Sequence, residues 1–167
     1  MGRRSDHSRE EIREMAIDAA AKIVETEGFK SLTARKVAAK IGYTVGTLYH
    51  VFRNFDDIVI HLNAQTIDEM AVLIQKNVKR KRSAETRIRT MAGVYVDYAT
   101  EHPDRWRLVF EHQAPRGLPT PELMKVRRDV LFEMVAENLR ELSPNHIAQE
   151  VDHTATALWS GIHGICI

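Results

Sequence analysis

The chain has 167 residues, 44% of them hydrophobic and 28% charged, which is an ordinary composition for a globular protein of one or two domains. It has a single cysteine, no run of 18 apolar residues and no apolar N-terminal segment, so we exclude a disulfide framework and a membrane span and expect a cytoplasmic protein. The net charge is +1, but the first 53 residues hold 10 basic and 7 acidic side chains, so the N-terminal segment is basic.

The first predicted helix begins near Ser8 and ends at Gly28. Ser8 and Glu11 have the spacing of a capping box, in which each side chain accepts a hydrogen bond from the other residue's backbone. Apolar residues then recur on one face, at Ile12, Met15, Ala16, Ala19, Ala20, Ile23 and Val24. The residues before Ser8 show no periodicity and include two arginines, so they form either a frayed terminus or an arm that follows nucleic-acid phosphates.

The stretch from Thr33 to Phe52 predicts two short helices joined by a tight turn. Thr33 and Thr44 stand where an N-cap hydroxyl accepts from a free backbone N–H, and Gly42 stands at the break, where the backbone is left-handed. Each helix has one apolar face, made by Val37, Ala38 and Ile41 in the first and by Leu48, Val51 and Phe52 in the second. This is the plan of a helix-turn-helix, whose second helix enters the major groove of DNA.

The same stretch is free of acidic residues. Between Gly28 and Arg53 there are five basic residues and no Asp or Glu, which suits phosphate binding, the main source of affinity for DNA. A plain helical hairpin, the alternative, does not explain this charge. The residues expected to contact DNA are Thr33, Lys36, Thr44, Val45, Gly46, Thr47, Tyr49 and His50. Of these, Thr44 and Tyr49 would hold phosphates, while residues 45–47 would approach base edges, with Val45 favouring a thymine methyl group.

The rest of the chain also predicts helices, so the fold class is all-α. Asn54 caps a helix that runs to about Arg80, further helices span about 83–101, 103–110 and 121–142, and Ser143-Pro144 caps the last one. Their apolar stripes include Leu73, Val126, Val130, Ile147 and Ile165. Residues 114–121 contain three prolines and predict a loop. We expect a three-helix DNA-binding domain at 1–53 and a larger helical regulatory bundle, for effector binding and dimerisation, at 54–167.

The chain resembles the TetR family of transcription regulators from Glu11 to about Leu62. The resemblance is carried by the first helix, by G-F-K-S-L-T, by V-A-A-K-I-G-Y-T-V-G-T-L-Y-H-V-F and by N-F-D-D-I. In the C-terminal half, A-L-W-S-G-I-H-G at 157–164 and H-P-D-R-W at 102–106 resemble a subgroup with a W-x-x-x-H-G signature. The resemblance implies a homodimeric repressor that binds a palindromic operator in the nucleoid and is released by a small apolar or amphipathic effector.

Aromatic and apolar residues of the C-terminal half could line an effector cavity between helices, although each of them could also simply fill the core. They are Met70, Tyr95, Tyr98, Trp106, Phe110, Met134, Trp159 and His163. The alternative function is a helical module that senses a small molecule without binding DNA. We find no catalytic motif, no cofactor motif and no cluster of histidines with metal-ligand spacing, so we expect neither an enzyme nor a bound cofactor or metal.

Two features depart from the family pattern. Phe55 stands where the family usually has a lysine, so a phosphate contact is expected to be missing. The sequence ends at Ile167 inside an apolar run, whereas family members usually continue into one more helix. Either the protein is naturally short, in which case its dimer interface differs from the usual four-helix arrangement, or the sequence is truncated.

Overall fold

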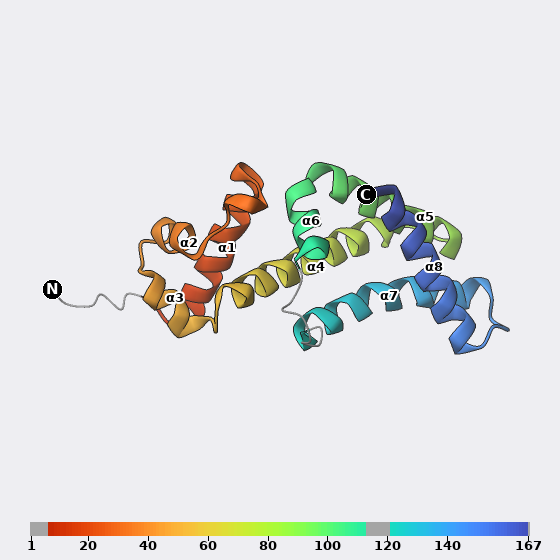
Figure 1. The fold of residues 1–167 in the computed structure, drawn as a ribbon. Helices are drawn as coiled ribbons and strands as arrows, with labels where there is room; N and C mark the ends of the chain where they lie inside the picture. The colour runs from red at the N-terminus through yellow and green to blue at the C-terminus, as the bar shows by residue number, and fades with distance from the viewer. Residues whose placement is uncertain (1–6, 113–120, 167) are drawn as a thin grey trace.

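The structure, a computed structural model, describes residues 7–112 and 121–166. These residues form eight α-helices and one short 3-10 helix and contain no strand, which confirms the all-α fold class. The helices are α1 (Arg9–Glu27), η1 (Phe29–Ser31), α2 (Ala34–Lys40), α3 (Val45–Val51), α4 (Phe55–Val78), α5 (Ala84–Glu101), α6 (Pro103–Glu111), α7 (Glu122–Leu142) and α8 (Ala148–Cys166). In Figure 1, α1–α3 gather at one end of the molecule and α4 runs from them toward α5, α7 and α8.

The ends of α1 are those predicted. The Ser8 hydroxyl accepts from the N–H of Glu11 (3.2 Å), and the Glu11 carboxylate accepts from the N–H of Ser8 (2.6 Å), so the capping box is complete. Gly28 ends the helix with φ 79°, a backbone conformation that a side chain would strain. The buried face of α1 packs against α2, α3 and α4.

The helix-turn-helix prediction is confirmed in its caps, its turn and its core. The hydroxyl groups of Thr33 and Thr44 each accept from the backbone N–H three residues later, at 3.2 Å. Gly42 has φ 75°, and a Cβ there would meet nothing within 4 Å, so the turn favours glycine for its backbone conformation and not for lack of space. Leu48 and Phe52 of the second helix are almost completely buried against α1.

The long helix α4 joins two hydrophobic cores. The Asn54 side chain caps it by accepting from the N–H of Asp57 (2.8 Å). Its first half contributes Ile58 and Leu62 to the N-terminal core, and its second half contributes Met70 and Ile74 to the core shared with α5, α6, α7 and α8. Burying such a side chain stabilises the fold by about 1.5–3 kcal/mol, so α4 is anchored at both ends.

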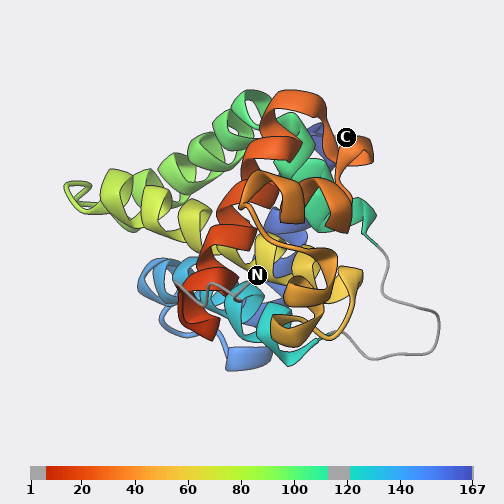
Figure 2. The same cartoon turned by 90° about the vertical axis from the view of Figure 1, so that its left-hand side faces the viewer.

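The short helix α6 belongs to both cores. Leu108 packs in the N-terminal core, where its carbonyl accepts from the buried Asn63 amide of α4 (3.1 Å), whereas Trp106 packs in the second core. Figure 2 views the molecule from the α2–α3 end, with α6 lying behind these helices. Because its two faces lie in different cores, α6 cannot shift without disturbing both of them.

Arg105 of α6 is a buried charge at the junction of α1, α4 and α6. Its Nη1 lies 2.7 Å from a Glu69 carboxylate oxygen and 3.3 Å from a Glu25 carboxylate oxygen, and its Nη2 donates to the Thr66 hydroxyl (2.9 Å). The Tyr98 hydroxyl of α5 also donates to Glu69 (3.3 Å). The guanidinium is 5% exposed, so this network, which the sequence analysis did not anticipate, ties the N-terminal helices to the C-terminal bundle.

Several predictions made along the apolar stripes are wrong. Leu73, Val126, Val130, Ile147 and Ile165 are at least 38% exposed, because these helices are covered on fewer sides than their sequences can accommodate. The last helix does not begin at Ser143-Pro144. A turn in which His146 N donates to the Ser143 carbonyl (3.1 Å) comes first, and the Glu150 carboxylate then accepts from the N–H of Ile147 (3.2 Å) before the helix starts at Ala148. The predicted N-terminal arm lies outside the described residues, as does the predicted loop up to residue 120.

Candidate nucleic-acid interface

The second helix of the helix-turn-helix, α3, packs against α1 and α2 with its apolar face. Its other face is open: Gly46 and His50 are exposed, Tyr49 is 45% exposed and Thr47 is half-buried. The two cap residues, Thr33 and Thr44, are exposed on the same unit. An exposed helix of this kind, with hydroxyl groups and an aromatic ring on its free face, can lie in a major groove.

The first turn of α3 combines a cap with a small residue. The hydroxyl groups of Thr44 and Thr47 lie 3.0 Å apart, so each is held in place by the other. At Gly46 a Cβ would meet only the Thr44 hydroxyl, at the ordinary contact distance of 3.6 Å. The protein itself therefore tolerates a side chain at Gly46. Close approach by a partner is a reason for glycine that fits this exposed position.

Two of the expected contact residues are partly engaged within the protein. Val45 is half-buried and packs against the N-terminal core, so only part of its side chain faces outward. The Lys36 ammonium donates to the Glu27 carboxylate of α1 at 2.6 Å, and this hydrogen bond lowers the pKa of Glu27. The positive charge of Lys36 is therefore offset by a neighbour that lies nine residues away in the sequence.

The C-terminal end of α3 is fixed to α1 and α4 by Arg13. The Arg13 guanidinium donates to the Val51 carbonyl (3.4 Å), lies over the Phe52 ring at 5.7 Å from its centroid and reaches Nε2 of His61 (3.3 Å). Nδ1 of His61 in turn donates to the Asp57 carbonyl of α4 (2.7 Å). These contacts mean that the direction of α3 follows the position of α4.

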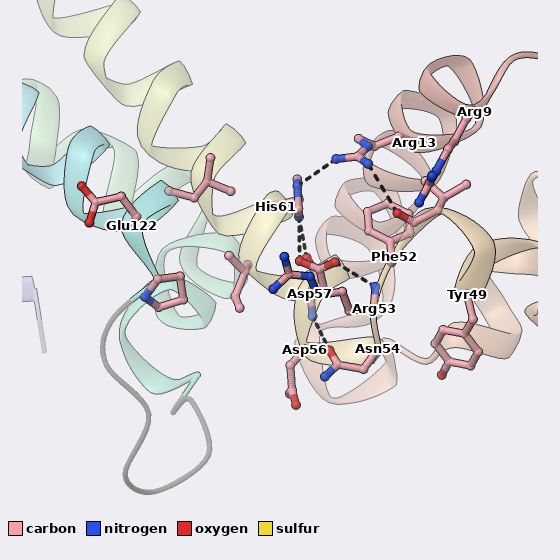
Figure 3. Close-up of a pocket in the computed structure, with 14 residues that line it drawn as sticks. Arg9, Arg13, Tyr49, Phe52, Arg53, Asn54, Asp56, Asp57, His61 and Glu122 are labelled. Atoms are coloured by element: carbon pink, nitrogen blue, oxygen red, sulfur yellow. Dashed lines mark hydrogen bonds and ion pairs between the residues drawn. The ribbon is translucent and has the colours of Figure 1, made fainter.

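A cleft of about 870 Å³ opens beside this tether, between α1, the end of α3, the start of α4 and the start of α7 (Figure 3). Arg9 and Arg53 lie along it and are both exposed, with Tyr49 nearby. They widen the basic surface next to α3 but were not among the residues expected to contact DNA. Arg53 lies in the acid-free stretch of the sequence, whereas Arg9 joins the surface only because α1 packs across α3.

Phe55 shows what replaces the lysine that is usual in the family. It is the first residue of α4, it is half-buried, and it packs against the N-terminal core. An aromatic ring at this position adds apolar contact within the protein, but it provides no charge for a phosphate.

The C-terminal bundle contains a small apolar cavity of about 60 Å³. Its lining residues are Ile74, Ile88, Met91, Ala92, Tyr95, Leu131, Val135, Leu158, Trp159 and Ile162. Tyr95 and Trp159 were predicted to line an effector cavity. The other predicted residues lie around it: Met70, Tyr98 and Trp106 are buried in the same core, Met134 packs against that core, and Phe110 and His163 contact Trp159. Periodicity placed most of the remaining lining residues on apolar faces but could not distinguish a cavity wall from filled core.

Five rings from α5, α6 and α8 surround His163. Its ring stacks on Trp159 with 4.8 Å between centroids and an angle of 10°, and lies 5.1 Å from Trp106 and 4.4 Å from Phe110. The Tyr95 hydroxyl is 2.8 Å from Nδ1 of His163. Burial lowers the pKa of His163 and raises that of Tyr95, so both side chains are uncharged at neutral pH.

Two other kinds of site were searched for within the described ranges. No group of three or more His, Cys, Asp or Glu side chains lies close enough together there to hold a metal ion. In the same part of the chain, none of the helices combines the length and the apolar character that crossing a bilayer requires.

Comparison with protein families settles what this arrangement of helices belongs to. Residues 16–62 match the family model described as bacterial regulatory proteins, tetR family, and residues 88–167 match that of the tetracyclin repressor-like C-terminal domain. The chain belongs to the TetR family. A TetR-family protein with this N-terminal helix-turn-helix is a DNA-binding transcriptional regulator.

Individual relatives of this TetR-family chain are distant. It is 25% identical over 156 residues to an uncharacterized HTH-type transcriptional regulator of Mycobacterium tuberculosis, covering 93% of this chain and 68% of that protein. It is 28% identical over 72 residues to the fatty acid metabolism regulator protein of Bacillus subtilis, covering 43% of this chain and 37% of that protein. The crystal structure of the transcriptional regulator FadR from Bacillus subtilis in complex with stearoyl-CoA has the same fold, with a TM-score of 0.73 and 15% identity over 92% of this chain and 84% of that one.

Proposed function

We propose that the protein is a homodimeric repressor that binds a palindromic operator through α3 and is released by a small apolar or amphipathic effector. In this proposal residues 1–53 bind DNA, and residues 54–167 bind the effector and the second subunit. The observation that carries it is the open face of α3, where Thr47 and Tyr49 face outward on a unit that has no acidic residue between Gly28 and Arg53. The protein would act on the chromosome, in the cytoplasm.

The contacts on DNA follow from the position of each side chain. Thr33, Thr44 and Tyr49 lie at the edges of the helix-turn-helix and would bind phosphates, which fix the register of the protein on the duplex. Gly46 and Thr47, with the outward part of Val45, would approach base edges, and His50 and Lys36 would lie beside them. In a dimer the two α3 helices would occupy half-sites one turn of DNA apart, ~34 Å, or a multiple of it.

The exposed face of α8 supports the dimer. Residues 154–166 contain no Asp, Glu, Lys or Arg, and five of them lie on one exposed face at helical spacing: Thr154, Ala157, Leu158, Gly161 and Ile165. Small and apolar residues let a second helix approach closely, and a surface without charge loses little on being covered. A second copy of α8 across a twofold axis is the partner that we propose.

The effector would enter the cavity between α4, α5, α7 and α8. The cavity walls are apolar, apart from the Tyr95 hydroxyl and the indole of Trp159, which suits an apolar or amphipathic molecule. That FadR of Bacillus subtilis was crystallised with stearoyl-CoA supports this class of effector. The stacked pair of Trp159 and His163 supports membership of the W-x-x-x-H-G subgroup, because both signature side chains meet in one cluster.

A gel-shift experiment with DNA from the region upstream of the protein's own gene tests the proposal. We expect the wild type to retard this DNA and the Thr47→Ala, Tyr49→Ala double variant to retard it at least tenfold less, since a base-reading and a phosphate contact are both lost. Thr100→Ala, on the exposed side of α5, is the control. Equal retardation by the double variant, or a logarithm of affinity that does not fall with the logarithm of salt, would instead favour the sensing module without a DNA role.

A further inference from the structure

We propose that the effector carries a single uncharged hydrogen-bond acceptor on an apolar body, and that the indole N–H of Trp106 is the donor that binds it. This inference rests on the proposed function, since it assigns the chemistry of the effector that the C-terminal bundle receives. It would make the ligand a ketone, ester, thioester or similar carbonyl compound and not a free carboxylate or a hydrocarbon.

The starting observation is an orphan donor. Trp106 is only 5% exposed, and its Nε1 is fully buried and makes no hydrogen bond with any of the described residues. Buried indole N–H groups usually have a partner, because the cost of stripping water from the group is otherwise not recovered. An unpaired donor in the core of a proposed binding domain is therefore a group that a ligand can satisfy.

The neighbouring acceptors are already used by one another. The Tyr95 hydroxyl and Nδ1 of His163 form a hydrogen bond of 2.8 Å, and the other rings against Trp106 are carbon faces. The Trp106 N–H is close enough to Tyr95 to oppose, in part, the rise in the Tyr95 pKa caused by burial. It nevertheless lacks the geometry of a hydrogen bond with that hydroxyl.

The orphan donor adjoins the apolar cavity. Tyr95 and Trp159 belong to the cavity wall, and both also belong to the ring cluster that includes Trp106 and His163. The cavity of about 60 Å³ is smaller than a ligand of drug-like size needs, so side chains must move on binding. Phe110 and Leu158, each 37% exposed, stand at the solvent edge of this region and are the ones most free to do so.

The absence of charge around this site selects for an uncharged acceptor. None of the side chains lining the cavity among the described residues is charged. His163, the one titratable base in the ring cluster, is held neutral because burial lowers its pKa. A carboxylate placed there would lose its water without gaining a counter-ion, whereas a carbonyl oxygen needs only one good donor.

Three probes of similar size test the inference: 2-heptanone, its hydrocarbon counterpart 2-methyl-1-heptene, and hexanoate. The protein has two tryptophans, both in this ring cluster, so quenching of its intrinsic fluorescence reports binding. At pH 7.5 we expect the wild type to bind the ketone about tenfold more tightly than the alkene and than hexanoate, which is the effect of about one buried hydrogen bond.

The variant Trp106→Phe keeps the ring and removes the N–H. We expect it to bind the ketone and the alkene equally, with Trp159 as the reporter, while the matched variant Trp159→Phe keeps the tenfold preference. Retention of the preference by Trp106→Phe, a wild type that prefers hexanoate or the alkene, or a wild type that binds none of the probes would overturn the inference. The gel shift is scored separately: loss of DNA binding by the wild type removes the proposed function but leaves the probe preference standing as a property of the site.

Discussion

The ammonium of Lys36 lies 2.6 Å from the Glu27 carboxylate, and so a residue expected to contact DNA is paired with a residue of another helix. Glu27 and Lys36 are both about half exposed, which leaves the pair next to the basic surface of α2 and α3. The strength of DNA binding by this TetR-family protein should therefore depend on an acidic residue that touches no DNA.

Glu27→Gln should raise the affinity for operator DNA about threefold at low salt, because Lys36 is released and the surface gains one positive charge. The slope of log affinity against log salt should steepen by roughly 0.9, the value for one added phosphate contact. Fluorescence anisotropy across a salt series measures both quantities. Glu85→Gln, which breaks the exposed pair with Arg89 on α5 and changes the net charge equally, should leave both values unchanged. Weaker binding by Glu27→Gln would show that the pair positions Lys36 for DNA.

Arg105→Met should destabilise the fold by about 2–3 kcal/mol in urea unfolding. The change leaves Glu25 and Glu69 near each other without their cation, and it leaves Thr66 without its donors. Removing one partner of a fully buried pair costs about 3–5 kcal/mol, and the smaller value is expected here because both carboxylates are more than a third exposed. Arg89→Met, at an exposed pair four residues apart on α5, should cost less than about 0.5 kcal/mol. Equal losses in the two variants would mean that the Arg105 network contributes no more than a surface pair.

Ala157→Glu should convert the proposed dimer to a monomer. The carboxylate would be placed at the centre of the charge-free face of α8, where a second copy would bury it without a partner. Light scattering after size exclusion measures the mass, which should fall by half. Val72→Glu, at a 62% exposed position of α4, is the control and should keep the mass of the wild type. A dimer that persists in Ala157→Glu would place the interface elsewhere.

Mild acid should destabilise the protein through His163. Burial holds the pKa of this side chain below its ordinary value in the folded state, so the unfolded chain binds the proton more readily. Stability is therefore unaffected well above pH 6.5 and is lost as the pH falls below it. The Tm of the wild type should drop more between pH 7.5 and 5.5 than that of His163→Gln, as measured by circular dichroism. His153→Gln, at an exposed position on the same helix, should behave like the wild type; if it removes the same part of the drop, another group is responsible.

The sequence alone determined the helices, their caps and the turn of the DNA-binding unit. Ser8, Thr33, Thr44 and Asn54 cap the helices as predicted, and Gly42 takes the left-handed conformation predicted for it. These features depend on hydrogen bonds and backbone angles within about four residues, so they can be read from neighbouring letters.

Only the tertiary structure decided which partners these helices acquire. The pairs Lys36–Glu27 and Arg105–Glu69, the tether of Arg13 to His61 and the ring cluster around His163 join residues 9 to 68 positions apart. The same holds for the apolar stripes, since Leu73 and Val126 have the spacing of buried residues but lie on faces that no described helix covers. Periodicity shows that a helix has an apolar face, whereas the crossing angles and the number of neighbouring helices decide whether that face becomes core, cavity or open surface.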